Sequence, residues 1–203
     1  MNKNTVPVLR PEPLENDIHP LIAGRWSTRA FDADRPVDKQ ILDRLFEAAR
    51  WAPSAMNVQS WRFLSFGPEN PEALGKAREC LMPGNAWALN APRLLFVMAR
   101  TSRPGGKGEH PWAKYEAGMA AYAMALQAAD CGLAFHQMAG FDGKKLRTDF
   151  SIPDDFAVIT AAAVGWPASA DVVPENKRAM ETEPRQRRPL GSIVFSGGQV
   201  PQD

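Results

Sequence analysis

The clearest repeat of hydrophobic and polar positions lies between Asp38 and Trp51. Apolar residues recur there at the i, i+3 and i+4 spacing of one helix face: Ile41, Leu42, Leu45, Phe46, Ala48 and Ala49. The spacing predicts an amphipathic helix that begins at Asp38, a suitable N-cap residue, and ends before Pro53, which cannot continue it. Two shorter helices are predicted over 71–81 and 143–150.

A second long segment, residues 112–131, is so rich in alanine and methionine that a polar face is hard to find. Because nearly every side is apolar, the segment is predicted to form a helix that is buried on most of its faces. Gly132 follows it and is a suitable C-terminal stop.

Short apolar runs between the helices have the length of strands. Residues 93–99 read Arg-Leu-Leu-Phe-Val-Met-Ala, a continuous run that is typical of a buried strand. Further strands are predicted over 61–66, 133–138 and 156–164, with a late short strand over 192–195. Helices and strands alternate irregularly, so the predicted fold class is α+β, a sheet between layers of helices with a C-terminal segment that reaches out to another surface.

Proline and glycine mark the segments outside these elements. Residues 1–16 carry three prolines and mixed charges, and they are predicted to form an extended N-terminal arm in front of one domain over 17–203. The stretch 101–111 holds three glycines and two prolines and is predicted to be a mobile loop, able to act as a lid. From about residue 168 the chain is polar and prolyl, which indicates a C-terminal extension of the domain.

Composition excludes several classes of protein. A chain of 203 residues with 44% hydrophobic residues is long enough for one substantial domain. Its formal net charge of +1 gives no global reason to expect nucleic acid or an anionic membrane as a partner. Cys80 and Cys131 form neither a CxxC motif nor a metal-ligand cluster, and no apolar run approaches the roughly 20 residues of a membrane span. The expected location is the cytoplasm, and no metal site is predicted.

Two short stretches concentrate cations in a pattern that suits an anion. Arg25, Ser27 and Arg29 stand at alternate positions, so in an extended segment they share one face. Two guanidiniums and a hydroxyl on one face suit a phosphate. Arg185 and Arg187 repeat this spacing near the C-terminus. Taken alone, each stretch is equally compatible with solvated surface arginines.

Residues 52–63 read Ala-Pro-Ser-Ala-Met-Asn-Val-Gln-Ser-Trp-Arg-Phe and join the first predicted helix to the first predicted strand. Proline, serine and asparagine are ordinary turn formers, so a plain loop is one interpretation. The other is a ligand-binding turn, because small and amide residues between two rigid elements offer backbone groups to a flat polar ligand.

Together these motifs resemble those of the FMN-dependent nitroreductase family. That family has, in this order, an Arg-x-Ser-x-Arg/Lys start, an Ala-Pro-Ser-x-x-Asn-x-Gln-Pro-Trp turn, a Gly-Phe-Asp-like segment and a late basic pair. Residues 25–29, 52–63, 140–142 and 185–189 match in sequence and spacing, and the resemblance spans about residue 18 to 195. It implies a three-layer α+β fold around a mostly antiparallel sheet, bound FMN, and a homodimer with the flavin sites at its interface.

The resemblance also implies a role for each matching residue. The FMN phosphate would be held by four residues: Arg25, Ser27, Arg185 and Arg187. The pyrimidine end of the flavin would lie beside Arg29, where a cation stabilises the negative charge of the reduced ring. The other edge of the ring would meet three residues: Gln137, Ala139 and Gly140. The second subunit would contribute four: Pro53, Ser54, Ala55 and Asn57.

Three positions depart from the family pattern. Ala139 stands where some relatives carry Glu, but the backbone N–H is the expected contact there, so little is lost. Ser60 stands where the family usually has proline, which predicts a looser turn. Trp26 occupies a place often held by Arg or His, so packing is expected to replace a polar contact to the cofactor.

The activity that the resemblance implies is a ping-pong transfer of a hydride from NADH or NADPH through FMN to a nitroaromatic, a quinone or a similar small acceptor. Flavin chemistry of another kind on the same fold, such as dehalogenation, flavin fragmentation or azoline oxidation, is one alternative. A flavin-binding module without turnover is another. His19 and His136 have no acidic or serine partner at a triad-like spacing, so no side chain is predicted to be a titrating catalyst.

Overall fold

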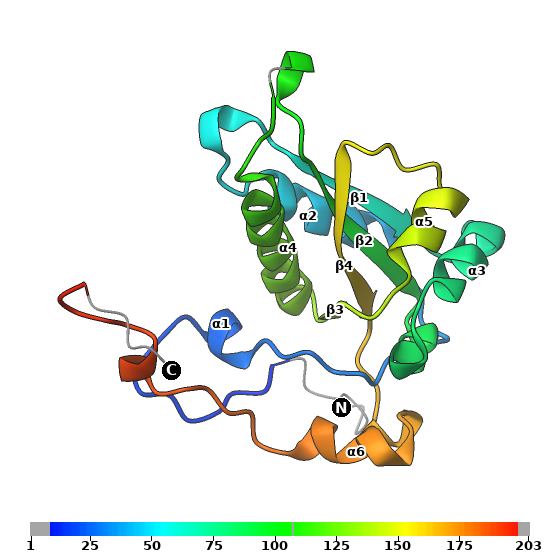
Figure 1. The fold of residues 1–203 in the computed structure, drawn as a ribbon. Coiled ribbons are helices and arrows are strands. Elements are labelled where there is room, and N and C mark those ends of the chain that lie inside the picture. Colours follow the sequence, from blue (N-terminus) through cyan, green and yellow to red (C-terminus); the bar gives the residue numbers. More distant parts are fainter. Residues whose placement is uncertain (1–8, 107, 199–203) are drawn as a thin grey trace.

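A computed structural model describes residues 9–106 and 108–198. Its centre is a four-stranded sheet in the order β1-β2-β4-β3, in which every neighbouring pair is antiparallel (Figure 1). The strands are β1 (Trp61–Phe66), β2 (Arg93–Arg100), β3 (Ala134–Met138) and β4 (Phe156–Gly165). The sheet and the positions of its four strands confirm the expectation from the sequence.

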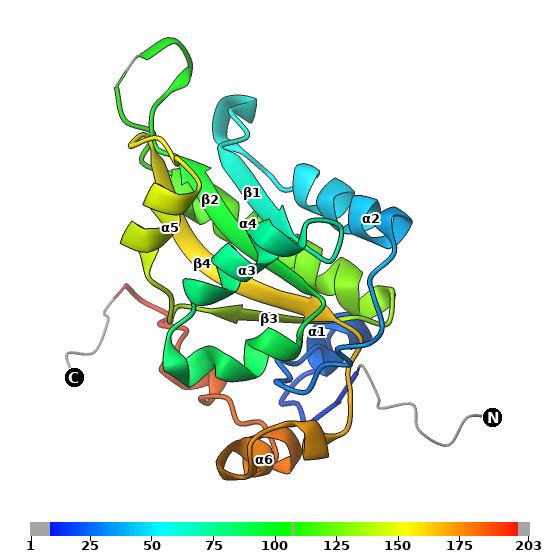
Figure 2. The same ribbon diagram turned by 90° about the vertical axis from the view of Figure 1, so that its right-hand side faces the viewer.

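Helices cover both faces of the sheet and complete the three layers. One face carries α2 (Lys39–Arg50) and α4 (Ala113–Asp130), and the other carries α3 (Pro71–Glu79) and α5 (Gly143–Asp149) (Figure 2). These four helices agree with the predicted ones. Two further helices, α1 (Pro20–Gly24) and α6 (Glu175–Thr182), lie in segments for which no element was predicted. Along the described residues, no helix has the length and apolar character that a membrane crossing needs.

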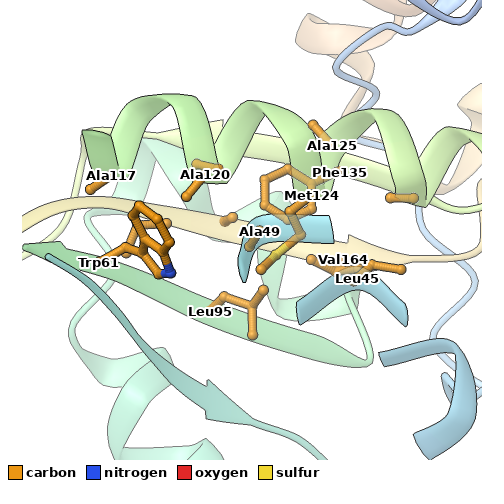
Figure 3. Close-up of a cluster of buried hydrophobic side chains, with 14 of the residues drawn as sticks. Leu45, Ala49, Trp61, Leu95, Ala117, Ala120, Met124, Ala125, Phe135 and Val164 are labelled. Carbon is orange, nitrogen blue, oxygen red and sulfur yellow. The ribbon is translucent and has the colours of Figure 1, made fainter. Parts of the chain in front are cut away.

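The central strand β2 joins the two halves of the core. Its side chains alternate: Leu95 and Val97 pack towards α2 and α4, while Leu94 and Phe96 pack towards α3 and α5. Figure 3 shows the first of these clusters, where small residues of α4 lie directly on the sheet. The alanines therefore have a packing role, since their size lets the helix approach the strands closely.

The surface of α4 differs from the expectation that most of its faces are buried. Ala117, Ala121 and Met124 are fully buried, but Tyr115 and Tyr122 on the other side are 66% and 41% exposed. The prediction is thus wrong for a single chain. The outward side carries both aromatic and charged residues, so the contrast between the two sides is weak in the sequence.

The C-terminal region leaves the sheet and runs beside the N-terminal segment (Figure 1). The predicted late strand over 192–195 is wrong: residues 190–192 form a 3-10 turn, and Ile193 and Val194 are 60% and 56% exposed. No sheet edge among the described residues reaches this apolar run, so it has no strand to pair with. Residues 9–16 contain no helix and only the isolated bridge of Leu9 to Arg25, while residues 1–8 of the predicted arm lie outside the described residues.

Candidate cofactor site

The cationic segment 25–29 follows α1 and brings Arg25 and Ser27 together. The Arg25 Nη1 donates to Ser27 Oγ over 3.3 Å, so these side chains share one face, as their alternate spacing predicts. Arg185 approaches from the C-terminal segment: its Nη1 donates to the carbonyl of Arg25 over 2.8 Å, and its Nη2 donates to the carbonyls of Ala23 and Arg10. Arg185 therefore supports the backbone on which Arg25 stands. Beside it, the Arg10 guanidinium lies 5.2 Å from the centre of the Trp26 ring.

The positive charge of this cluster is compensated in part, because Glu12 Oε1 lies 3.6 Å from Arg185 Nε and 3.5 Å from Arg10 Nε. Burial lowers the pKa of Arg25; the Tyr122 hydroxyl opposes that change, while the charges of Arg185 and Arg187 lower the pKa further. Within residues 9–106 and 108–198, no carboxylate lies within ion-pair distance of Arg25 or Arg187. Arg25 and Arg187, which have no such carboxylate, together with the Ser27 hydroxyl have the donor chemistry that a bound phosphate needs.

Arg29 lies next to this cluster and is half-buried. Its Nη1 is 3.6 Å from Glu181 Oε1, and its guanidinium lies 5.9 Å from the centre of the Trp87 ring. The preceding residue, Thr28, is fully buried, and its carbonyl is 2.8 Å from His136 Nδ1 on β3. This bond ties the cationic segment to the open edge strand of the sheet.

The segment Gln137 to Gly140 ends β3 at the same edge. Gln137 and Ala139 are exposed, and the carbonyl of Gly140 accepts hydrogen bonds from Met82 N at 3.0 Å and Asn85 Nδ2 at 2.9 Å. A Cβ at Gly140 would lie 2.7 Å from Asn85 Nδ2, so a larger residue would require the Asn85 side chain to move. The missing side chain at Gly140 therefore makes room for Asn85.

The turn that contains Pro53, Ser54, Ala55 and Asn57 has a strained backbone. Met56, Asn57 and Gln59 have φ values of 52°, 56° and 53°, in the left-handed region that costs free energy for residues other than glycine. Such strain persists only where the surroundings enforce it, and it is frequent at ligand sites. Pro53, Ser54 and Ala55 line a cavity of about 220 Å³ together with four residues of the neighbouring segment: Trp112, Tyr115, Glu116 and Met119.

Glu116 in the first turn of α4 is the buried group that holds this turn. Its carboxylate accepts hydrogen bonds from Ala55 N and Ser60 Oγ, both at 2.8 Å, and lies 3.1 Å from His110 Nε2. The Ser60 hydroxyl, at the position where the family usually has proline, anchors the turn to α4. His110 brings the 101–111 loop into the same cluster.

A single chain unites some of the predicted site residues and separates others. The segments 25–29, 137–140 and 185–187 lie around one end of the sheet and are joined by the bonds of Thr28 and Arg185. The turn over 53–57 instead packs against the start of α4, far from α1 in Figure 1. Sequence reasoning missed Thr28, Trp87 and Glu181, which support Arg29.

His136 makes the site region sensitive to acid. Burial lowers its pKa to about 4; the bond to the Thr28 carbonyl opposes this shift, and the charges of Arg29 and Arg25 add to it. Between pH 6.5 and about 4 the unfolded chain therefore binds a proton here that the folded chain does not, so the free energy of unfolding falls as the pH falls, by up to about 1.4 kcal/mol per pH unit.

His136→Asn is expected to flatten this pH dependence, because the amide can still donate to Thr28 but does not titrate. The measurement is urea denaturation between pH 4 and 7, with exposed His19→Asn as the matched control. Equal slopes for His136→Asn and the wild type would show that His136 is not the titrating group.

The layers and the sheet order define an α+β protein, with a candidate site at the cationic end of its sheet. The model of the nitroreductase family matches residues 22–83 and 68–166, and the chain belongs to this family. The crystal structure of an oxidoreductase containing FMN superposes with a TM-score of 0.85 at 36% identity, covering 92% of this chain and 94% of that chain.

Relatives of similar length support the assignment to the family. An NADH dehydrogenase of Thermus thermophilus is 28% identical over 202 residues, covering 84% of this chain and 91% of that protein. Protein DrgA of Synechocystis is 29% identical over 206 residues, covering 88% of this chain and 95% of that protein.

Proposed function

We propose that this protein is an FMN-dependent NAD(P)H oxidoreductase that reduces a small acceptor such as a nitroaromatic or a quinone. The observation that carries the proposal is the cluster of Arg25, Ser27 and Arg187, which has phosphate-binding chemistry and no acidic partner among the described residues. The FMN-containing relative and the relative named NADH dehydrogenase support the choice of cofactor and electron donor.

Bound FMN would supply the ring that accepts and returns the hydride, and the chain would bind and orient it. Arg25, Ser27 and Arg187 would hold the phosphate. Arg185 would add charge there, while its N–H groups fix the backbone of Arg25. Trp26 would pack beside them.

The residues around the sheet edge would orient the ring. Arg29 would stabilise negative charge at the pyrimidine end of the ring, and Gln137, Ala139 and Gly140 would line the opposite edge. Such preorganised charge at a fixed position stabilises the reduced cofactor without reorganisation of the protein.

The apolar outer face of α4 supports a homodimer. Trp112, Tyr115 and Tyr122 are exposed along it, and Met119 lies between them. In a two-fold dimer across this face, the start of one α4 would lie opposite the end of the other. The turn 53–57 of one copy would then approach the 25–29 segment of its partner, so each FMN would be bound by both chains. The exposed residues of the C-terminal extension would also lie on the partner.

The test is the visible spectrum of the purified protein before and after anaerobic addition of NADH or NADPH. A yellow protein that is bleached by one of them, and reoxidised by a nitroaromatic or a quinone, is expected. Colourless protein that cannot be reconstituted with FMN would refute the proposal. Bound FMN that neither nucleotide bleaches would favour the binding module without turnover.

A further inference from the structure

Glu181 of α6 reaches from the C-terminal extension to the back of Arg29. Only 2% of its side chain is exposed. Its Oε2 accepts a hydrogen bond from Thr28 Oγ1 at 2.5 Å, its Oε1 accepts one from Arg29 N at 3.0 Å, and the same Oε1 lies 3.6 Å from Arg29 Nη1. One buried carboxylate thus contacts both the backbone and the guanidinium of Arg29.

The remaining bonds around Glu181 keep it in this position. Thr28 Oγ1 also accepts a hydrogen bond from Ala30 N at 2.9 Å, and Arg10 donates to the Glu181 carbonyl at 2.8 Å. A buried carboxylate is stable only when hydrogen bonds and a counter-charge compensate its loss of water. Here Thr28 and the Arg29 amide supply the hydrogen bonds, and the Arg29 guanidinium supplies the charge.

The ion pair with Glu181 weakens the positive electrostatic potential of Arg29 on the side that faces away from Glu181. The Arg29 side chain is 21% exposed and the Trp87 ring flanks it, so water screens the pair only in part. A negative charge 3.6 Å behind a cation weakens the positive potential in front of it. Any ligand that gains negative charge beside Arg29 is therefore stabilised less than it would be by an unpaired arginine.

We infer that Glu181 is a positioning residue that holds Arg29 and lowers the reduction potential of FMN bound beside it. The inference rests on the proposed function, since reduced FMN is the ligand that carries the added negative charge. The C-terminal extension, which contains Glu181, would then affect the reduction potential of FMN in addition to covering a surface.

Glu181→Gln tests this inference, because the amide keeps an oxygen for Arg29 N and an N–H for Thr28 Oγ1 but removes the charge. The potential of bound FMN is measured by anaerobic equilibration with a reference dye. We expect it to become more positive, with the ratio of the dissociation constants of oxidised and reduced FMN shifted about tenfold towards tighter binding of the reduced form, or about 30 mV for two electrons. Glu175→Gln removes the same charge from an exposed position on α6 and is expected to leave the potential unchanged.

Two further variants separate charge from structure. Thr28→Val keeps the carboxylate and removes one of its bonds, so we expect a lower Tm of the apoprotein and an unchanged potential. In an Arg29→Gln background, Glu181→Gln is expected to produce no further shift, because its effect acts through Arg29. If Glu181→Gln does not fold, Glu181→Asp, which moves the charge away from Arg29, should raise the potential by a smaller amount.

The inference is overturned by an unchanged or lower potential in the Glu181 variants, or by an equal shift in Thr28→Val or Glu175→Gln. Those results leave the proposed function standing, because FMN is still bound and reduced. A wild-type protein that takes up no FMN refutes the proposed function itself, and the inference with it.

Discussion

Arg25→Ala is expected to weaken FMN binding about 100-fold or more, the largest loss for a single residue of the site. The Arg25 guanidinium is half-buried, contacts Ser27, and has no ion-pair partner in the described part of the chain. Its removal would leave a phosphate without its best-placed donor. Fluorescence titration of the apoprotein with FMN measures the loss, and Arg44→Ala, an exposed arginine of α2, is the control with unchanged affinity.

Arg185→Ala is a useful contrast to Arg25→Ala. Because the Arg185 side chain donates to three backbone carbonyls, its removal should lower the Tm of the apoprotein, whereas Arg25→Ala should leave that Tm nearly unchanged. Wild-type FMN affinity in Arg25→Ala would show that the phosphate lies elsewhere.

Glu116→Ala is expected to lower the free energy of unfolding by about 3 kcal/mol. The substitution removes a buried carboxylate and leaves Ala55 N, Ser60 Oγ and His110 without their shared partner. The strained turn over 53–57 then loses its anchor, so FMN affinity should fall as well. Urea denaturation of the apoprotein measures the first effect, and Glu116→Gln, which keeps an acceptor, should lose less.

Protonation of Glu116 at acid pH is expected to lower the free energy of unfolding. Burial raises the pKa of Glu116, but the hydrogen bonds from Ser60, His110 and Ala55 lower it by more, so it lies below the ordinary value of 4.5. This stabilisation is present above pH 4.5 and is lost as the pH falls through the folded-state pKa; Glu116→Gln should lack that loss. A Glu116→Ala protein as stable as the wild type would refute the anchoring role.

Much of the fold follows from local patterns. The period of residues 41–49 and the apolar run of 93–99 predict α2 and β2, because each pattern reports directly on burial in the core. The outward face of α4 and the absence of the strand over 192–195 could not be predicted in this way. An aromatic helix face and an apolar C-terminal run look buried in sequence, and only the three-dimensional structure shows what packs against them.

The site was predictable where its residues form short motifs. Arg25 and Ser27 share one face, as their alternate spacing predicts. The residues that support the site could not be predicted in this way. Glu181 is separated from Arg29 by 152 positions in the sequence, and Glu116 is separated from Ala55 by 61. No spacing in a single sequence reports contacts of that kind.

We propose that each FMN is bound by Arg25 of one chain and by the 53–57 turn of the other. This proposal can be tested with mixed dimers of Arg25→Ala and Ala55→Trp, which fills the cavity beside the turn. Each variant alone should bind FMN weakly. The mixed dimer, purified with two different tags, should bind one FMN with wild-type affinity, because one of its two sites combines an intact Arg25 with an intact turn. A mixed dimer that has no high-affinity FMN site would contradict the proposal that both chains bind each FMN.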